Sequence, residues 1–391
     1  MQQIGAVQPS LKAIDMKGHP GSDQQRALSV IDTGEPLAPE FELFNEGDEL
    51  YAAMARSIRA ATHRVFLASY ILTADEVGIV LLDELMRQSR RGLDVRIHID
   101  ALGSGSGLPR RHRRLLRAAG VSLQRFHRWS WRQPMRYNRR DHRKLLVVDG
   151  QTAYLGGFNI HRESSQRFYG PTRWRDVHAC FSGALAAEAE TLFDTFWCGH
   201  PDGDPLRHTS GDSRIVPNTT RTCRIQLRCT IKDQLAAASE TIWLATPYFV
   251  PDRGLRRQLI LAARRGVDVR ILTTEKTDSA PAQWAARAFY GELTENGVRV
   301  FEYAPRLLHS KVLLVDDDWG SIGTANFDYR SLFINYELTL ISRNSALISQ
   351  LRKTFLEDLQ ESAEIIGMAW KHRGLLDGIF DVFGRLLRKW L

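Results

Sequence analysis

The chain has no long apolar run. No stretch of its 391 residues approaches the apolar length of a membrane-spanning helix, so we expect no transmembrane segment. The first residues, 1–27, hold no positively charged start followed by an apolar core, which predicts neither a signal peptide nor a membrane anchor there. These two absences indicate a protein that is either soluble or peripheral to a membrane.

Cysteine is also scarce. The spacing of the four cysteines does not fit a zinc site, and their density is far below that of a secreted disulfide scaffold. They are Cys180, Cys198, Cys223 and Cys229. We therefore expect reduced and mostly buried thiols in a cytosolic setting.

The chain has more positive than negative charge. Lys and Arg number 53 and Asp and Glu number 45, which gives a net charge of +8. This excess favours a polyanionic partner, either an anionic bilayer or a nucleic acid, and charge alone does not separate the two. With 43% hydrophobic residues, the chain is long enough to form two or three domains with substantial cores.

A repeated motif is the main positive feature. Each copy has the pattern His-x-Lys-x-x-x-x-Asp, where x is any residue. A Gly follows the Asp by seven residues and an Asn follows it by ten. Every member recurs 167 positions later. The first copy is His142, Lys144, Asp149, Gly156 and Asn159, and the second is His309, Lys311, Asp316, Gly323 and Asn326. Two complete copies at one offset indicate an internal repeat.

The motif makes chemical sense on a β-strand. Apolar β-formers at 145–148 and 312–315 predict buried strands that end in a turn at each motif Asp. Residues i and i+2 of a strand point to one side, so each His shares a face with its Lys. Brought together across a pseudo-twofold axis, the two copies would form one site with two imidazoles and two ammonium groups.

Such a site suits a phosphodiester. One imidazole can attack as nucleophile while the other protonates the leaving group, because neutral His serves both roles near pH 7. The lysines, with Asn159 and Asn326, supply fixed donors for the charge on the non-bridging oxygens. The ammonium groups do by charge what Mg²⁺ does at other phosphoryl-transfer sites, so we expect neither a metal nor another cofactor.

These residues resemble the phospholipase D superfamily, which carries the doubled motif. The strings TPYFVPD at 246–252 and HSKVLLVDD with GTANFDYRSLFINYEL from 309 onward narrow the resemblance to bacterial cardiolipin synthases, most closely the B type that lacks an N-terminal membrane hairpin. The resemblance covers roughly residues 40–365. It implies phosphatidyl transfer between two phosphatidylglycerol molecules, giving cardiolipin and glycerol through a phosphatidyl-histidine intermediate.

The resemblance also implies roles for four carboxylates. A nucleophilic imidazole needs its second nitrogen held, and the superfamily carries a carboxylate some thirty residues after each motif His that hydrogen-bonds to it. Asp176 and Glu337 stand near these positions and are the expected orienting groups. The motif residues Asp149 and Asp316 are expected mainly to hold the site and the domain interface.

Helical and strand patterns alternate in the same order through both halves. Gly92 and Gly266 are predicted at left-handed helix C-caps before equivalent strands. The pattern predicts an α/β fold with two pseudo-twofold-related phospholipase D-like α/β/α units that share one active site at their interface. The predicted boundaries are a poorly ordered segment at 1–35, unit 1 at 36–198, a linker at 199–220, unit 2 at 221–365 and an amphipathic helix at 366–391.

Two basic segments have no counterpart in the repeat. The insertion at 126–141 mixes arginine with Trp129, Trp131 and Tyr137, a composition that suits lipid phosphates, single-stranded bases or a solvated loop. At 373–391, bulky apolar residues fall on one helical face opposite charged residues. That pattern is typical of a helix lying in the plane of an anionic bilayer, and also of a helix docked on a core or in an oligomer.

We therefore expect a peripheral enzyme on the cytoplasmic face of the bacterial cell membrane. Its partners would be phosphatidylglycerol and the anionic membrane surface, with no nucleic acid. His142 would act as nucleophile and His309 as acid, with the substrate phosphate among the motif lysines and asparagines. Two alternatives stay open: a phospholipase D-type hydrolase or metal-independent nuclease of the same superfamily, and a non-catalytic lipid-binding protein.

Overall fold

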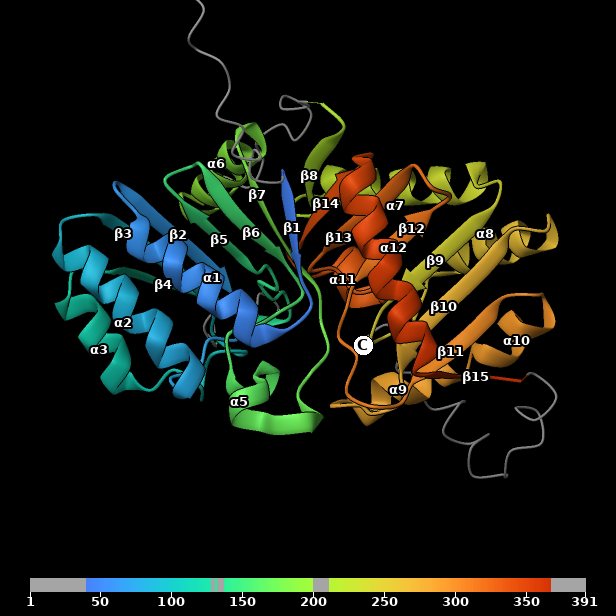
Figure 1. Ribbon diagram of the computed structural model, residues 1–391, viewed down its shortest axis with the longest axis horizontal. Helices are drawn as coiled ribbons and strands as arrows, with labels where there is room; N and C mark the ends of the chain where they lie inside the picture. Colours follow the sequence, from blue (N-terminus) through green and yellow to red (C-terminus); the bar gives the residue numbers. More distant parts are fainter. Residues whose placement is uncertain (1–39, 128–130, 132–136, 200–210, 367–391) are drawn as a thin grey trace, which may run out of the picture. The chain divides into compact units, whose positions relative to one another are not determined.

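The computed structural model describes residues 40–127, 131, 137–199 and 211–366. Within these ranges the chain forms two α/β halves, coloured blue to green and yellow to red in Figure 1. The predicted N-terminal segment 1–35 and the amphipathic helix at 373–391 lie outside the described residues, as do most of the basic insertion and part of the linker.

Each half is built on one mixed β-sheet. Among the described residues, the first sheet runs β1-β7-β6-β5-β2-β3-β4 and the second β15-β11-β10-β9-β12-β13-β14-β8. Strands β2, β3 and β4 are parallel, as are β9, β10 and β11, and the other neighbours are antiparallel. Read from β4 and from β11, the two sheets have the same strand order, with β15 added at one edge of the second. The predicted repeat of α/β units is confirmed.

The strand bounds follow the apolar segments of the sequence. The first sheet contains β1 Phe41–Phe44, β2 Arg64–Ser69, β3 Asp94–Asp100, β4 Ser122–Phe126, β5 Leu145–Val148, β6 Thr152–Gly156 and β7 His178–Ser182. The second contains β8 Ser213–Pro217, β9 Thr241–Ala245, β10 Asp268–Thr274, β11 Arg299–Tyr303, β12 Val312–Val315, β13 Trp319–Gly323, β14 Leu338–Ser342 and β15 Ser362–Glu364. The end of the predicted linker therefore forms β8, an edge strand of the second sheet.

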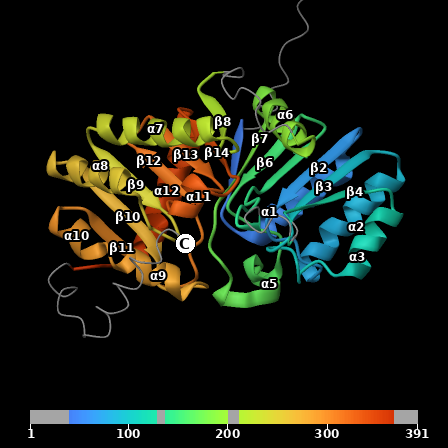
Figure 2. The same ribbon diagram turned by 180° about the vertical axis from the view of Figure 1, so that it is seen from behind.

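Helices cover both faces of each sheet. In the first half they are α1 Gly47–Ala60, α2 Glu76–Arg90, α3 Arg110–Ala118, α5 Gln166–Tyr169 and α6 Ala184–Trp197, with short 3₁₀ turns at Arg162–Ser164 and Gly170–Thr172. In the second they are α7 Arg221–Ala237, α8 Arg253–Arg264, α9 Ala280–Arg287, α10 Tyr290–Glu295, α11 Tyr329–Phe333 and α12 Ser345–Gln360. Helices α1 and α2 lie in front of the first sheet in Figure 1, and α7 and α8 in front of the second sheet in Figure 2. None of the described helices combines the length and apolarity needed to cross a membrane.

Strand alternation divides the buried residues among three cores. On β2, Val65 and Leu67 face a core shared with α1 and α2, whereas Phe66 and Ala68 face the opposite side, because successive strand residues point to opposite faces. On β9, Ile242 joins the corresponding core of the second half. The alternation thus places central strands such as β2 and β9 between two apolar layers.

The third core joins the halves. It combines residues of both sheets with α6 and α12, as in Phe181 beside Ile215 and Leu340. Helix α6 of the first half packs on β8 of the second, and α12 of the second packs on β1 of the first. This exchange of helices holds the two sheets in a fixed relation and brings their facing loops together.

Equivalent caps define the helices of the two halves. Asp75 caps α2 through the backbone N–H groups of residues 77 and 78, and Asp252 caps α8 through those of 254 and 255. Gly92 and Gly266 follow these helices with φ of +92° and +93°, a left-handed backbone conformation that glycine adopts without steric cost. The predicted C-cap glycines are confirmed.

The prediction for the cysteines is only partly correct. All four are free thiols, but Cys198 and Cys229 are exposed and Cys180 is only partly buried. Cys223 alone is buried among the four. The sequence spacing gave no disulfide or zinc framework, but it held no information on which face of its helix or strand each cysteine occupies.

Candidate active site

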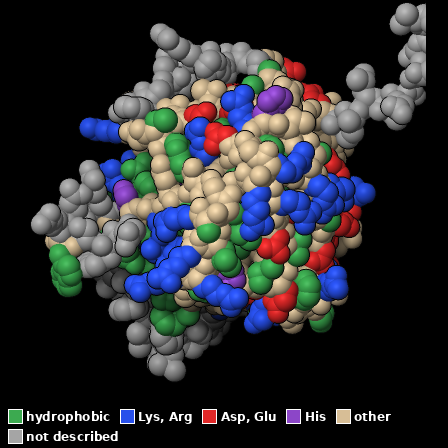
Figure 3. All heavy atoms as spheres, turned by 90° about the vertical axis from the view of Figure 1, so that its left-hand side faces the viewer, with side chains coloured by type: hydrophobic (Ala, Val, Ile, Leu, Met, Phe, Trp, Pro, Cys, Tyr) green, Lys and Arg blue, Asp and Glu red, His purple; other side chains and the backbone are tan. Residues whose placement is uncertain are grey.

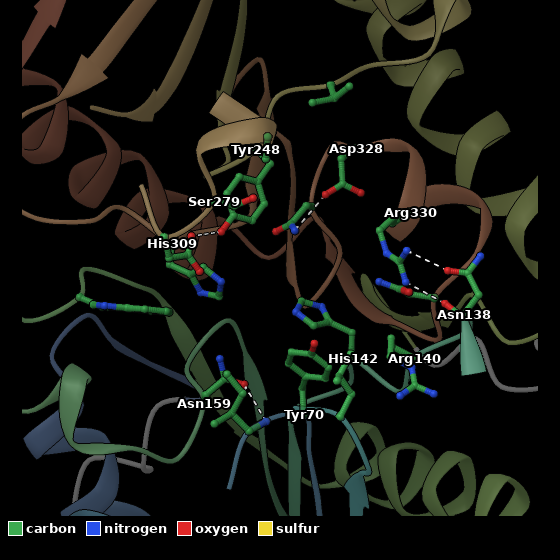
Figure 4. A pocket seen from close by; sticks show the side chains of 18 of the residues that line it. Tyr70, Asn138, Arg140, His142, Asn159, Tyr248, Ser279, His309, Asp328 and Arg330 are labelled. Carbon is green, nitrogen blue, oxygen red and sulfur yellow. Dashed lines mark hydrogen bonds between the residues drawn. The ribbon is translucent and has the colours of Figure 1, made fainter. Parts of the chain in front are cut away.

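Both motif histidines line one cavity between the two halves. The cavity has a volume of about 410 Å³, and His142 and His309 approach it from opposite sides, as Figure 4 shows. Asn159 and Asn326 line the same cavity, so each motif copy contributes a His and an Asn. The predicted convergence of the two histidines is therefore present in the structure.

Backbone contacts between the halves hold each histidine in place. The N–H of His142 donates to the carbonyl of Tyr336 at 2.9 Å, and the N–H of His309 donates to the carbonyl of Arg175 at 2.7 Å. Each motif segment is thus anchored on the other half of the molecule. Because the anchors cross the interface, the site depends on the assembly of both halves.

The two orienting carboxylates also cross the interface. Nδ1 of His142 lies 3.0 and 3.1 Å from the carboxylate oxygens of Glu337, which belongs to the second half. Nδ1 of His309 lies 2.6 Å from Oδ2 of Asp176, which belongs to the first half. The resemblance predicted that each carboxylate would bond the His of its own copy, and this pairing is wrong. The sequence identified the right carboxylates, but chain distance does not show which half each one faces.

The tautomer of His142 follows from its partners. Besides Glu337, the backbone carbonyl of Thr324 lies 3.1 Å from Nδ1, and a carbonyl oxygen can only accept. Nδ1 therefore carries the proton, and a neutral imidazole presents an unprotonated Nε2. The hydroxyl of Thr324 donates to Glu337 and fixes the carboxylate in turn.

The surroundings of His309 differ. Its Nδ1 lies 2.8 Å from Nζ of Lys311 as well as close to Asp176, so a donor and an acceptor meet the same nitrogen. Burial and the ammonium groups of Lys311 and Lys144 lower the pKa of His309 well below its ordinary value. Burial, partly offset by Glu337, also lowers the pKa of His142. Both imidazoles are therefore predominantly neutral at pH 7 before a substrate binds.

The two motif lysines are buried beside the histidines. Nζ of Lys144 donates to the backbone carbonyl of His142 at 2.9 Å, and Nζ of Lys311 donates to the carbonyl of His309. Burial, partly offset by Glu337, lowers the pKa of Lys144 to about 7, and burial, partly offset by Asp176, lowers that of Lys311 to about 8. An anion entering the cavity would raise both values, because it favours the charged form.

The asparagines are held by neighbours within their own halves. The side-chain oxygen of Asn159 accepts from the N–H of Ile71 at 3.2 Å, which leaves its amide group as a donor at the cavity. Nδ2 of Asn326 donates to Asp328 at 3.1 Å. Burial raises the pKa of Asp328 to about 6, so this carboxyl can gain a proton near neutral pH.

Sequence reasoning missed several cavity residues. Tyr70 packs edge-on against the His142 ring at 4.8 Å between centroids, and Tyr248 donates to Asp278 on the His309 side. Arg330 bonds Asn138 at 3.0 Å on the rim. Tyr248 lies in the string TPYFVPD, and Arg330 in GTANFDYRSLF, so both stood in strings that carry the family resemblance. Their presence in these strings was the available signal.

The motif aspartates do not line the cavity. Asp149 accepts from the backbone N–H groups of residues 62–64, and Asp316 from those of residues 239–241. The hydrogen bonds of each aspartate lie within its own half, at the start of β2 for Asp149 and of β9 for Asp316. The prediction that they hold the domain interface is wrong, and their position makes direct catalysis implausible. Both residues have positive φ, +54° and +49°, which a short polar side chain tolerates best.

We expect Asp316→Ala to destabilise the fold. Loss of three charge-assisted bonds to backbone N–H groups, together with the positive φ, should lower the free energy of unfolding by about 2 kcal/mol. Asp317→Ala is a matched control, because its 76% exposed side chain makes a surface ion pair with Arg352 and should contribute less than about 0.5 kcal/mol. Chemical denaturation of both variants checks this. Equal losses would remove the structural role of Asp316.

The described residues around the cavity do not form a cluster of metal ligands. In the part of the chain that the structure describes, no three His, Cys, Asp or Glu side chains gather as a metal-binding group. The polar groups of the residues that line the cavity are imidazole, amide, phenol, hydroxyl, indole and guanidinium groups with two carboxyls, those of Asp278 and Asp328. Such donors suit an anionic substrate.

Comparisons with known proteins agree with this geometry. A family model described as "Cardiolipin synthase, PLD-like domain" matches residues 54–197 and 231–359. The chain is 30% identical over 361 residues to a probable cardiolipin synthase of Bacillus subtilis, covering 88% of this chain and 71% of that protein. It is 32% identical over 372 residues to a cardiolipin synthase of Geobacillus, covering 90% and 72%.

A solved structure supports the fold. The phosphatidylserine synthase of Haemophilus influenzae matches with a TM-score of 0.68 at 15% identity, covering 90% of this chain and 93% of that one. A polyphosphate kinase of Porphyromonas gingivalis matches with a TM-score of 0.60 at 12% identity, covering 89% and 52%. At these identities the likeness concerns the arrangement of the two α/β halves.

Proposed function

The chain belongs to the family of cardiolipin synthases with phospholipase D-like domains, and from this premise we propose that it transfers a phosphatidyl group from one phosphatidylglycerol to another. The observation that carries the proposal is the single cavity in which His142 and His309 meet, each held by a carboxylate of the opposite half. Two independently held imidazoles suit a reaction with two successive displacements at one phosphorus.

The first step forms a covalent intermediate on His142. Its Nε2 carries the free lone pair, because two acceptors hold the proton on Nδ1. Attack on phosphorus forms the P–N bond and breaks the P–O bond to the glycerol headgroup. The phosphate anion of the bound substrate and Asp176 favour the charged form of His309, which takes up a proton when the substrate binds and gives it to the departing glycerol oxygen, so the leaving group departs as a neutral alcohol.

The second step reverses these roles. His309, now neutral, takes the proton from a hydroxyl of a second phosphatidylglycerol, whose oxygen attacks the phosphorus. The P–O bond forms, the P–N bond breaks, and His142 is regenerated with cardiolipin as product. Asn159, which lines the cavity, would bind the non-bridging oxygens, and Lys144 and Lys311, buried beside the histidines, would stabilise the charge that builds up there.

The lysines give substrate binding a predicted pH dependence. At pH 9 both are mostly neutral in the empty site, because the pKa of Lys144 is about 7 and that of Lys311 about 8. A bound phosphate raises both values, so binding above pH 8 takes up protons and affinity falls as pH rises, by up to about tenfold per unit for each proton taken up. Calorimetry of dihexanoyl phosphatidylglycerol with the His309→Ala variant, in buffers of different ionisation enthalpy, measures this uptake.

Lys144→Arg provides the control for this measurement. A guanidinium stays charged through this pH range, so one of the two protons should no longer be taken up. Binding at pH 8 without any proton uptake would contradict the lowered lysine pKa values.

We also propose that the protein works at the cytoplasmic face of the bacterial membrane as a peripheral enzyme. Its proposed substrates are bilayer lipids, and its four cysteines are free thiols, as a reducing compartment favours. The anionic bilayer surface is the expected partner, and no nucleic acid takes part. The predicted amphipathic helix at 373–391, outside the described residues, would add to the attachment.

Purified protein with phosphatidylglycerol vesicles tests the function. We expect cardiolipin and free glycerol in equal amounts by mass spectrometry, with no product from His309→Ala. Phosphatidic acid as the only lipid product would make the protein a hydrolase. No lipid product, with cleavage of DNA in the presence of a chelator, would make it a nuclease.

A further inference from the structure

Helix α3 carries a dense group of arginines that the proposed chemistry does not use. Five of its nine residues, within Arg110–Ala118, are arginine. With Arg125 of the neighbouring strand β4, four of them line a surface hollow of about 410 Å³. The arginines of the group, named here the α3 cluster, are Arg110, Arg111, Arg113, Arg114, Arg117 and Arg125.

The α3 cluster opposes the stability of its own helix. Arg110 and Arg114 stand four residues apart, as do Arg113 and Arg117, so like charges face each other along one side. The first turn has no acidic residue, and two arginines stand at the positive end of the helix dipole. Arg110, Arg111, Arg114 and Arg117 form no salt bridge with a carboxylate in the described part of the chain.

The fold does not require this cluster. The segment between β10 and β11 in the second half occupies the position that α3 has between β3 and β4. There, α9 and α10 carry one arginine, Arg287, with the acids Glu292 and Glu295. The same topological position is therefore filled without concentrated positive charge. A role outside folding accounts best for the arginines of α3.

A loop connects the active-site cavity with the helix that carries the cluster. Leu102, which lines the active-site cavity and is 50% exposed, stands in the loop that leads from β3 into α3. Leu115 of α3 itself is 43% exposed. Figure 3 looks onto the outer end of the first half and shows Lys and Arg side chains gathered there. The two exposed leucines thus lie on the loop that reaches the cavity and on the arginine-rich helix itself.

We propose that the α3 cluster is a docking surface for the anionic bilayer, and that its arginines bind the phosphate groups of the lipids. The guanidinium groups bind phosphates, while Leu102 and Leu115 reach the acyl boundary. This surface deepens the proposed function, on which it rests, because it holds the enzyme at the bilayer that contains the substrate. It also attracts the dianionic headgroup of the proposed product.

The exposed leucines favour a membrane over a nucleic acid. A groove for single-stranded nucleic acid combines basic side chains with aromatic rings on which bases stack. The hollow is lined by arginines alone, and the exposed apolar side chain on α3 itself is the aliphatic Leu115. Each arginine near an anionic surface contributes about 1 kcal/mol of attraction, so several together suffice for reversible binding.

Vesicle sedimentation of the full chain tests this proposal. The variant combines Arg111→Ala, Arg114→Ala and Arg117→Ala, three exposed residues of the cluster. The matched control combines Arg221→Ala, Arg253→Ala and Arg257→Ala, which remove the same charge from exposed positions on α7 and α8. The vesicles contain phosphatidylcholine, either alone or with phosphatidylglycerol as about 30% of the lipid.

The cluster variant should bind anionic vesicles on the order of 100-fold more weakly, and the control variant within about threefold of the parent. Activity of the cluster variant on dihexanoyl phosphatidylglycerol without micelles should stay unchanged, which would show an intact active site.

Equal vesicle binding by both variants would overturn the proposal. Competition by millimolar glycerol phosphate would also overturn it, because it would indicate a site for free phosphate. Loss of oligonucleotide binding alone would also overturn it. If the parent binds vesicles through the cluster but makes no lipid product, only the proposed function fails.

Discussion

Replacing His142 or His309 by alanine is expected to lower kcat by at least about 10⁴-fold. His142→Ala removes the nucleophile, and His309→Ala removes the group that protonates glycerol and activates the acceptor. The double variant should be no worse than either single one, because residues that act as a unit give non-additive losses. Initial rates on phosphatidylglycerol vesicles measure all three.

The control for these variants is His63→Ala. His63 is exposed at the start of β2 and lies outside the cavity, so its removal should leave kcat within about twofold of the parent. Unfolding curves should be similar for all histidine variants. A single variant that keeps more than a tenth of the parent activity would show that its imidazole takes no part in the chemistry.

The crossed carboxylates give the second large effect. Glu337→Gln and Asp176→Asn preserve shape but remove the negative charge, and each should lower kcat by about 10²- to 10⁴-fold. Glu337 raises the pKa of His142, so Glu337→Gln should lower that pKa further. Because His142 must be neutral to attack, the acid limb of the pH profile of kcat/KM should lie at lower pH in Glu337→Gln than in the parent protein.

Imidazole NMR of the same variants tests the crossed pairing itself. With labelled histidine, Glu337→Gln should shift the titration of His142, and Asp176→Asn should change the Nδ1 resonance of His309. Histidine substitutions assign the two signals. The opposite pattern, in which Glu337→Gln acts on His309, would mean that each carboxylate serves its own motif copy.

The repeat explains how much could be predicted from the sequence. Strand alternation and the constant offset between motif copies were sufficient to predict two α/β units and the meeting of His142 with His309, because both are local patterns applied twice. Glycines with positive φ, such as Gly92 and Gly266, were predictable for the same reason. These features depend on periodicity and on residue type, which the sequence shows directly.

Contacts across the interface could not be predicted in this way. Asp176 and Glu337 were found as carboxylates, but their partners depend on how α6 and α12 exchange between the halves, which is a tertiary arrangement. Asp316 was read as an interface residue because it belongs to the motif, yet its bonds all reach one strand start within its own half. The α3 cluster was overlooked because it lies outside the repeated motif.

Phosphorus stereochemistry tests the central claim most directly, that one shared site performs two displacements through His142. The measurement uses phosphatidylglycerol made chiral at phosphorus by sulfur substitution, and it determines the configuration of the thiophosphate that passes into cardiolipin. Two successive in-line displacements predict retention of configuration. Inversion would mean that the acceptor hydroxyl attacks directly, without a covalent intermediate on either histidine.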